Sequence, residues 1–319
     1  MHKVSLMLKK LGGVTFVKQL LKSRVLFFTM LIIPILGFEK KSLEIARLAI
    51  ANRKLQKLKR KYAKFIKEKK AQINPSKNRT RSNKIWVLWL QGIEQAPLLV
   101  KKCYESLQTH LRDYELVLLT EENYRDYVKF PDYIQHKIDS GVITKTHFSD
   151  LLRLELLEKY GGTWIDATVF CSGSNFHKCI LDSDLFVYQC LKPISDGDCF
   201  SVSSWLMTSS TNNPIISLTK ELLYEYWKKN DSMIDYFLIH YFFKISLESF
   251  PEEWSKVCPI CNAAPHMLLL RLFDHYDEKI WNVIKDQTAF HKLSYKFNKD
   301  QENLKDTFYE KMFKESSSV

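Results

Sequence analysis

The stretch 147–171, HFSDLLRLELLEKYGGTWIDATVFC, constrains the fold of this chain more than any other segment. Residues 150–160 are rich in apolar side chains at helical spacing. The glycines at 161–162 follow them, and glycine takes the positive φ with which many helices end. Residues 163–170 form an apolar run of β type that contains one acid, Asp166. The sequence therefore predicts a helix, a tight turn and a buried strand in succession.

Charged side chains are placed so that they can meet at one end of this unit. Asp150 and Arg153 are three residues apart and project from one face of the predicted helix. Because the turn folds the strand back, Asp166 can lie near the start of the helix. Two carboxylates and an arginine at the edge of a buried sheet indicate a site for phosphates, hydroxyls or a metal. The alternative is a surface ion pair and an unrelated acid in an edge strand.

The order of these features resembles a known signature. The string S-D-L-L-R, followed by G-G-x-W-I-D, is similar to that of glycosyltransferases of the A-type fold (GT-A) with a DXD motif. Within these it most resembles the bacterial capsular polysaccharide synthesis proteins, and more distantly the family 32 sugar transferases and the glucosylating clostridial toxins. The resemblance covers about residue 83 to the C-terminus and is strongest over 84–170.

The resemblance implies roles for individual side chains. Asp166 matches the first acid of the DXD motif, which holds ribose, sugar hydroxyls and the metal-bound region. Asp150 and Arg153 match the pair that binds the donor sugar hydroxyls and the phosphate side. Trp89 matches a tryptophan on which the uracil ring stacks, and Lys292 matches a cation for the diphosphate.

A divalent cation, Mn²⁺ or Mg²⁺, is also implied, with Asp166, Thr168 and His291 as its ligands. Thr168 stands where relatives commonly have a second acid, and a hydroxyl is a weaker ligand for a hard cation than a carboxylate. The alternative is that Trp86 and Trp89 are both core aromatics and that His291 is a packed residue of an apolar stretch.

Strand and helix patterns alternate from residue 84 onward. This alternation is typical of a Rossmann-like α/β sheet, in which ligands bind beyond the carboxyl ends of the strands. We therefore expect an α/β fold of GT-A type, a mixed sheet flanked by helices, over residues 81–319. The expected strands are 85–92, 114–119, 163–170, 186–190 and 203–210, with 288–296 a late strand or loop. The expected helices are 97–110, 214–227, 232–246 and 264–275.

Residues 1–80 form a separate basic helical appendage. Residues 1–84 hold 23 Lys and Arg against 3 Asp and Glu, a net charge of +20, whereas the rest of the chain has a net charge of −8. An amphipathic stretch begins near residue 6, and an apolar run over 25–38 is too short for an ordinary membrane crossing. A long basic helix is expected over 41–70. Such an arm suits an anionic membrane surface, but it is also compatible with a solvated helix, a helix packed on the body or a nucleic-acid-binding arm.

Several acidic and histidine residues fall outside the signature. The pairs at 182–184 and 196–198 imitate DXD but lie in turn-like polar segments, so we expect loops there. Asp235 and His240 lie in the apolar stretch 232–246. Either they face the acceptor substrate, or they form a polar contact with each other in the core. His266 has the same two alternatives.

Together these features predict a glycosyltransferase, a hexosyltransferase of capsular or exopolysaccharide biosynthesis. By resemblance it uses a nucleotide diphosphate sugar, a UDP-sugar by preference, acts on a lipid-linked glycan acceptor and retains the anomeric configuration. Its expected location is the cytoplasmic face of a bacterial cell membrane, bound to the anionic inner surface, and the seven cysteines fit a reducing cytoplasm. No nucleic-acid partner is expected. The alternatives are a nucleic-acid-binding protein that uses the basic arm and a non-catalytic scaffold of the same fold.

Overall fold

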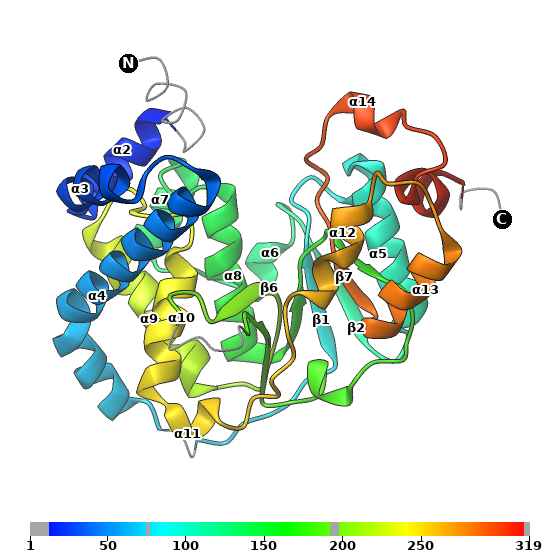
Figure 1. Cartoon of the computed structure of the whole chain (residues 1–319). Helices are drawn as coiled ribbons and strands as arrows, with labels where there is room; N and C mark the ends of the chain where they lie inside the picture. The colour runs from blue at the N-terminus through cyan, green and yellow to red at the C-terminus, as the bar shows by residue number, and fades with distance from the viewer. Residues whose placement is uncertain (1–12, 75–76, 192–197, 316–319) are drawn as a thin grey trace.

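A mixed five-stranded sheet lies at the centre of the molecule (Figure 1). The computed structural model describes residues 13–74, 77–191 and 198–315. The strand order is β2-β1-β3-β6-β5; β1 runs parallel to β2 and β3, and β6 runs antiparallel to β3 and β5. The predicted α/β fold with a mixed sheet is therefore confirmed. The strands are β1 Lys84–Leu88, β2 Glu115–Leu119, β3 Gly162–Ile165, β5 Leu185–Gln189 and β6 Val202–Ser209.

Helices cover both faces of this sheet, because alternate residues of each buried strand point to opposite sides. Trp86 of β1 packs in one hydrophobic cluster with α8 and α9, whereas its neighbours Ile85 and Val87 pack in another with α5. The helices of the first side are α4 Lys40–Gln72, α6 Tyr124–Tyr127, α7 Asp132–Asp139, α8 Lys145–Tyr160, α9 Pro214–Lys229, α10 Leu238–Ser249 and α11 Pro251–Trp254. On the other side, α5 Leu98–His110 packs with α12 Met267–Arg271 and α13 Glu278–Gln287, and the short α14 Lys299–Glu302 follows in the C-terminal segment.

The run predicted as one strand over 163–170 is in fact two strands in two sheets. β3 ends at Ile165, the chain turns through 166–168, and β4 Val169–Cys171 pairs with β7 Phe290–Lys292 in a separate antiparallel sheet. The prediction of a single strand was wrong. An apolar run does not reveal that its first half pairs with one strand, β6, and its second half with another, β7. Asp166 thus lies at the junction of the two sheets.

The double-glycine turn brings β3 close to β1. Gly161 ends α8 at φ +68°, and Gly162 opens β3 at φ +92°. A Cβ atom at Gly162 would lie 2.4 Å from the carbonyl oxygen of Lys84 on β1. The indole of Trp86 donates a hydrogen bond of 2.9 Å to the carbonyl oxygen of Gly161. The absence of side chains at the turn is therefore a packing requirement as well as a conformational one.

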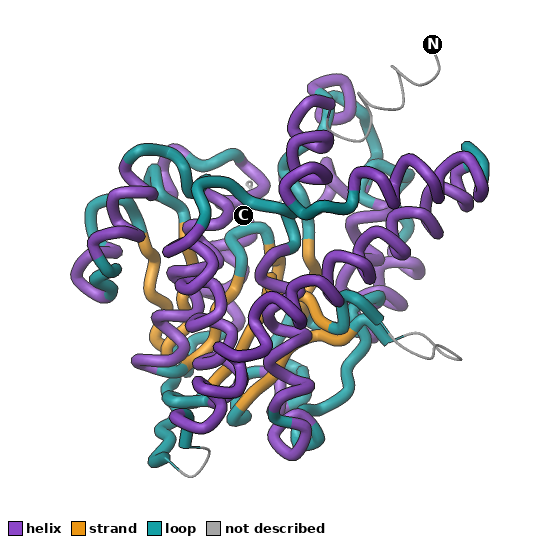
Figure 2. Tube along the Cα trace, turned by 90° about the vertical axis from the view of Figure 1, so that its left-hand side faces the viewer, coloured by secondary structure: helices purple, strands orange, loops and turns teal. Residues whose placement is uncertain are grey.

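The long helix of the basic arm is packed on the body, one of the alternatives open from the sequence, and the two shorter helices pack on it. The arm consists of α2 Gly13–Lys22, α3 Leu26–Leu36 and α4, which extends the helix predicted over 41–70. Leu55, Leu58 and Tyr62 of α4 belong to the same hydrophobic cluster as α9 and α10. Figure 2 views the molecule from this side, where helices lie in front of the strands. No helix in the described part of the chain is long and apolar enough to cross a membrane.

Some boundaries and residues differ from those expected. α8 starts at Lys145, five residues earlier than predicted, because the Thr144 hydroxyl accepts a hydrogen bond from a backbone N–H of the first turn. α10 starts at Leu238, so Asp235 precedes the helix, and its carboxylate pairs with buried Lys54 of α4 at 2.6 Å. The beginning of the amphipathic stretch, residues 1–12, and Asp196 lie outside the described residues.

Candidate active site

The three charged residues of the sequence signature converge. Arg153 Nη1 lies 3.4 Å from Asp150 Oδ1, one turn earlier on α8, and Nη2 lies 3.4 Å from Asp166 Oδ1 at the end of β3. The arrangement follows from the fold, because the turn at 161–162 makes β3 run back along α8. The spatial prediction from the sequence therefore agrees with the structure.

The guanidinium of Arg153 is fixed by several contacts. Its side chain is 4% exposed, and Nη1 donates a 2.6 Å hydrogen bond to the carbonyl oxygen of Ser204 on β6. The guanidinium carbon lies 4.9 Å from the ring centre of Trp164, whose indole N–H donates to Asp166 Oδ1 at 2.9 Å. A planar cation held by ring stacking and hydrogen bonds keeps its orientation before any ligand arrives.

A second cation reaches Asp166 from the far end of the chain. Lys292, the last residue of β7, has its Nζ 3.1 Å from Asp166 Oδ2 and 2.5 Å from Thr168 Oγ1. The pairing of β4 with β7 brings it there, and the backbone N–H of Leu293 donates to the carbonyl oxygen of Thr168 at 2.9 Å. Asp166 therefore lies between two cations, each on a different carboxylate oxygen.

The two acids have opposite pKa shifts. Burial raises the pKa of Asp150 to about 7, although the charge of Arg153 opposes this shift. Burial would also raise the pKa of Asp166, but the charges of Lys292 and Arg153 outweigh it, and the hydrogen bond from Trp164 acts in the same direction, so the pKa is lowered. At neutral pH Asp166 is ionised, whereas Asp150 is close to its midpoint.

Two cavities meet at these charges. The larger, of about 620 Å³, extends from Asp166 towards the ends of β1 and β7, and the smaller, of about 380 Å³, extends towards β6 and the start of α10. The residues that line both are Thr146, Ser149, Asp166, Tyr236 and Lys292. This arrangement gives room for two ligands whose reacting ends meet at the carboxylate.

The two candidate tryptophans have different positions. Trp86 is fully buried and is a core residue. Trp89 lines the larger cavity just beyond the end of β1 and packs edge-on against Tyr295, with ring centres 5.5 Å apart. Its indole N–H is buried without a hydrogen-bond partner among the described residues. Trp89 is therefore available to contact a flat ligand.

Aromatic and imidazole rings line the smaller cavity. His240 and His266, both left open from the sequence, lie there with Trp205 and Tyr236. Burial lowers the pKa of His240 to about 4, so it is neutral at pH 7. Sequence reasoning missed Trp205 and Tyr236, as well as Tyr295 in the larger cavity. Only the position of Tyr295, three residues after Lys292, gave a signal that could have found it.

His291 does not join the site. Adjacent residues of a strand point to opposite faces, so His291 and Lys292 diverge. The Nε2 atom of His291 lies 2.9 Å from Ser172 Oγ, and its ring packs near Phe170 and Trp281. Burial lowers its pKa to about 4. The structure therefore does not bring this predicted metal ligand to Asp166.

The donor atoms at Asp166 and Thr168 do not fit a divalent cation. Within the described part of the chain, no group of three or more His, Cys, Asp or Glu side chains could hold a metal ion. The Lys292 ammonium already contacts both oxygens. A divalent cation 4 Å from an ammonium would be repelled by about 8 kcal/mol at an effective dielectric constant of about 20. Lys292 would have to move away before a metal could bind.

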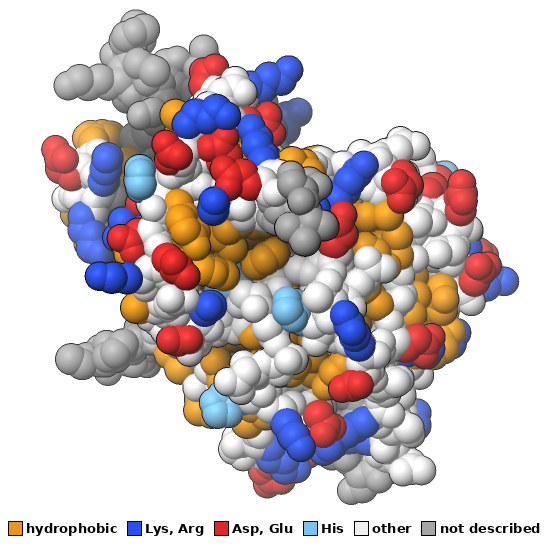
Figure 3. All heavy atoms as spheres, turned by 90° about the vertical axis from the view of Figure 1, so that its right-hand side faces the viewer, with side chains coloured by type: hydrophobic (Ala, Val, Ile, Leu, Met, Phe, Trp, Pro, Cys, Tyr) orange, Lys and Arg blue, Asp and Glu red, His pale blue; other side chains and the backbone are white. Residues whose placement is uncertain are grey.

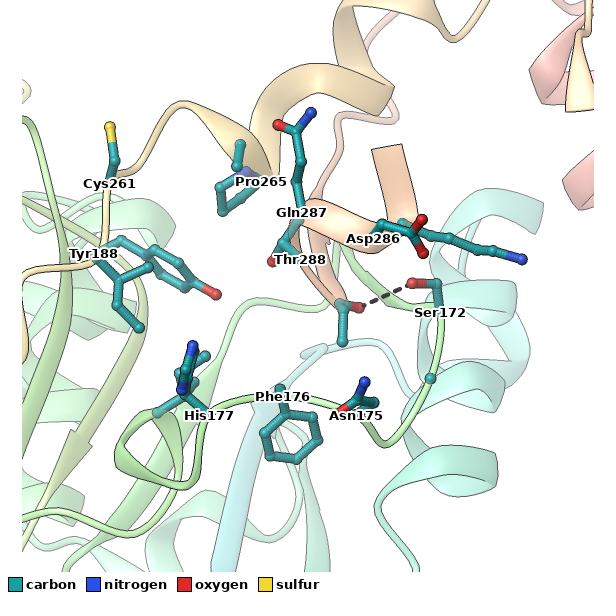
Figure 4. A pocket seen from close by; sticks show the side chains of 16 residues that line it. Ser172, Asn175, Phe176, His177, Tyr188, Cys261, Pro265, Asp286, Gln287 and Thr288 are labelled. Carbon is teal, nitrogen blue, oxygen red and sulfur yellow. Dashed lines mark hydrogen bonds between the residues drawn. The ribbon is translucent and has the colours of Figure 1, made fainter. Parts of the chain in front are cut away.

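A further cavity, of about 670 Å³, lies beside Tyr188 of β5 (Figure 4). Tyr188, His177 and Asn175 border it, and the segment from Asp286 to Thr288 borders it from the side of α13. Tyr188 stacks on Trp205, with ring centres 4.7 Å apart, so this aromatic pair separates the cavity from the one beside Arg153.

Comparisons with known proteins identify a family. The sequence model of the family described as "capsular polysaccharide synthesis protein" matches residues 37–312. No curated protein matches the chain. Among solved structures, "PaToxG Glycosyltransferase" is similar at a TM-score of 0.36 and 14% identity, over 83% of this chain and 96% of that one. A likeness at this level does not by itself identify a function.

Proposed function

The chain belongs to the family of capsular polysaccharide synthesis proteins, and we propose that it is a glycosyltransferase that moves a hexose from a nucleotide diphosphate sugar to a glycan. The family is the one predicted from the sequence, so a role in polysaccharide synthesis is confirmed. The proposed donor is a UDP-sugar, the acceptor is a lipid-linked capsular or exopolysaccharide repeat, and the anomeric configuration is retained.

The convergence of Asp150, Arg153 and Asp166 at the junction of two cavities supports this proposal above all. The larger cavity, with Trp89 in its wall, has the aromatic surface that a base requires. The smaller one has the rings and polar groups that sugars contact. A donor in the first and an acceptor in the second would have their reacting ends beside the carboxylate and the two cations.

In the proposed reaction, the bond between the anomeric carbon and the β-phosphate oxygen breaks, and its electron pair stays on the diphosphate. The acceptor hydroxyl oxygen bonds to the anomeric carbon on the same face, and its proton passes to the departing phosphate oxygen. Negative charge grows on the diphosphate as the bond breaks. Arg153 and Lys292 would stabilise that charge in the transition state more than in the bound donor.

The Asp166→Asn variant tests the assignment. We expect it to keep its fold by circular dichroism and thermal unfolding but to lose UDP-sugar hydrolysis and transfer on the order of 100-fold, the scale measured for single polar groups in active sites. Asp182→Asn is a matched control, since that acid is exposed and pairs with Arg81 at 3.2 Å. Wild-type activity in Asp166→Asn would refute the assigned role.

A thermal-shift screen of nucleotide sugars would identify the donor. A ligand that binds only the folded protein raises the unfolding temperature by mass action. We expect UDP and UDP-sugars to do so and ADP to have little effect. Stabilisation by ADP equal to that by UDP would contradict the proposed preference for uridine.

A membrane-facing role for the arm is part of the proposal. Phe27 and Ile35 of α3 are 82% and 72% exposed, and the basic helix α4 lies beside them. Exposed apolar side chains next to lysines and arginines suit the anionic inner surface of a membrane. The opposite face, over α5, α12 and α13, carries acidic and basic side chains interspersed (Figure 3). The described residues of this face add no basic surface to the arm, so the nucleic-acid alternative rests on the arm alone.

Vesicle sedimentation separates these alternatives. We expect binding to vesicles that contain phosphatidylglycerol, little binding to pure phosphatidylcholine, and loss of binding in Phe27→Glu/Ile35→Glu. Leu270→Glu, at a 72% exposed position on α12, is the matched control. Unchanged binding by the double variant, or preference for duplex DNA over anionic vesicles, would contradict the membrane role.

A further inference from the structure

Lys292 occupies the position between Asp166 and Thr168 that a divalent cation would need. Its Nζ contacts Asp166 Oδ2 at 3.1 Å and Thr168 Oγ1 at 2.5 Å, and the side chain lines both cavities of the site. We infer that this ammonium replaces the metal ion in this chain, so that the nucleotide diphosphate binds and leaves without a divalent cation. The inference rests on the proposed donor and specifies how its diphosphate is held.

The side chains present favour an ammonium over a metal. Magnesium requires near-octahedral coordination by oxygens, and its protein sites usually include one or two carboxylates besides the substrate phosphates. Here Asp166 is the carboxylate that shares the Lys292 ammonium with Thr168, and its two oxygens already contact Lys292 and Arg153. The other acid, Asp150, is 8% exposed and contacts Arg153. The oxygens that a metal would share are therefore engaged by cations.

The two cations together supply the charge of one divalent ion. Arg153 and Lys292 lie on different oxygens of Asp166, which holds them on either side of one carboxylate. An ammonium has three N–H donors. Asp166 and Thr168 accept two of them, and the third remains for a phosphate oxygen. This geometry also gives Thr168 a role, since its hydroxyl positions the ammonium where a carboxylate in relatives would ligate manganese.

Binding measurements in the presence and absence of metal test the inference. We expect UDP to bind the full chain with dissociation constants that agree within about twofold in EDTA and in Mn²⁺, a difference of no more than about 0.4 kcal/mol in binding free energy. We also expect the electron paramagnetic resonance signal of free Mn²⁺ to remain unchanged when protein is added. A requirement for Mn²⁺, or stoichiometric Mn²⁺ binding that Asp166→Asn abolishes, would overturn the inference but not the proposed function. Absence of UDP binding in both buffers would overturn both.

Substitutions at position 292 provide an independent test. Lys292→Met should weaken UDP binding in EDTA by about tenfold or more, the scale of one hydrogen bond to a charged group, whereas Lys292→Arg should retain most of it. Lys285→Met, on α13 beside the cavity of Figure 4, is the matched control and should bind as wild type does. Wild-type affinity of Lys292→Met in EDTA would refute the inference.

The double variant Lys292→Met/Thr168→Asp should restore a metal site. Its carboxylates at 166 and 168 would face the vacated position, so we expect UDP binding that depends on Mn²⁺ and a reduced signal of free Mn²⁺. Thermal unfolding checks that the double variant is folded. If the double variant does not fold, the affinity of Lys292→Met for UDP in EDTA still tests the inference. Binding of UDP by the folded double variant with no dependence on Mn²⁺ would count against the inference.

Discussion

The turn at 161–162 gives the sharpest stability prediction, through the substitution Gly162→Ala. The new methyl group would lie 2.4 Å from the carbonyl oxygen of Lys84, and φ at this position is +92°. A positive φ in a non-glycine residue costs about 1–3 kcal/mol, and overpacking of a tight site costs about 1–3 kcal/mol. We therefore expect a loss of about 4 kcal/mol in the free energy of unfolding.

Gly141→Ala is the matched control for the backbone contribution. Gly141 also has a positive φ, +72°, but a Cβ atom there would have no neighbour within 4 Å. The control should lose only about 1–2 kcal/mol. Urea unfolding followed by tryptophan fluorescence measures both losses. Equal losses would refute the close approach of β3 to β1, on which the position of Asp166 depends.

Three further predictions concern the site and its surroundings. Trp89→Ala should weaken UDP binding by about 1–3 kcal/mol in calorimetry, the range for base stacking on an aromatic ring, and an unchanged affinity would exclude stacking. Arg153→Met should cost about 3–5 kcal/mol of stability at pH 7, because it leaves the buried Asp150 carboxylate without its cation and the Ser204 carbonyl oxygen without its donor. Because the pKa of Asp150 is raised to about 7, Asp150 is protonated at pH 5 and needs no cation there, so Arg153→Met should cost less stability at pH 5 than at pH 7. Equal losses of stability at both pH values would contradict this role of the Asp150 charge. Burial lowers the pKa of His147 to about 3, below its ordinary value of 6.5, so the unfolded chain binds a proton between these values that the folded chain does not. Stability should fall by about 1.4 kcal/mol per pH unit on acidification through this window, and His147→Gln, which can still accept a hydrogen bond from Trp227, should show a flatter dependence in urea unfolding.

Local sequence predicted the centre of the site because its geometry is local. The helix ends at glycines, the strand must fold back along it, and the side-chain period of each element sets which residues face each other. Asp150, Arg153 and Asp166 therefore meet as expected. Each step depends only on neighbours within one supersecondary unit.

Features set by distant segments were not predictable in the same way. The end of β3 at Ile165 depends on where its partner changes from β6 to β7. Which of His291 and Lys292 faces Asp166 depends on the pairing of segments far apart in the chain. The buried side of α4 is likewise selected by α9 and α10, because a basic helix with a loose apolar stripe leaves several faces available.

The short sheet of β4 and β7 has three residue pairs, with Val169 opposite Lys292 and Phe170 opposite His291. A shift of β7 by one residue would exchange the faces of these two side chains. An imidazole would then approach the carboxylate in place of an ammonium. A single insertion or deletion before β7 would thus convert the proposed lysine-assisted chemistry into a metal-assisted one, while the helix, the glycines and the acid that follows β3 stayed the same.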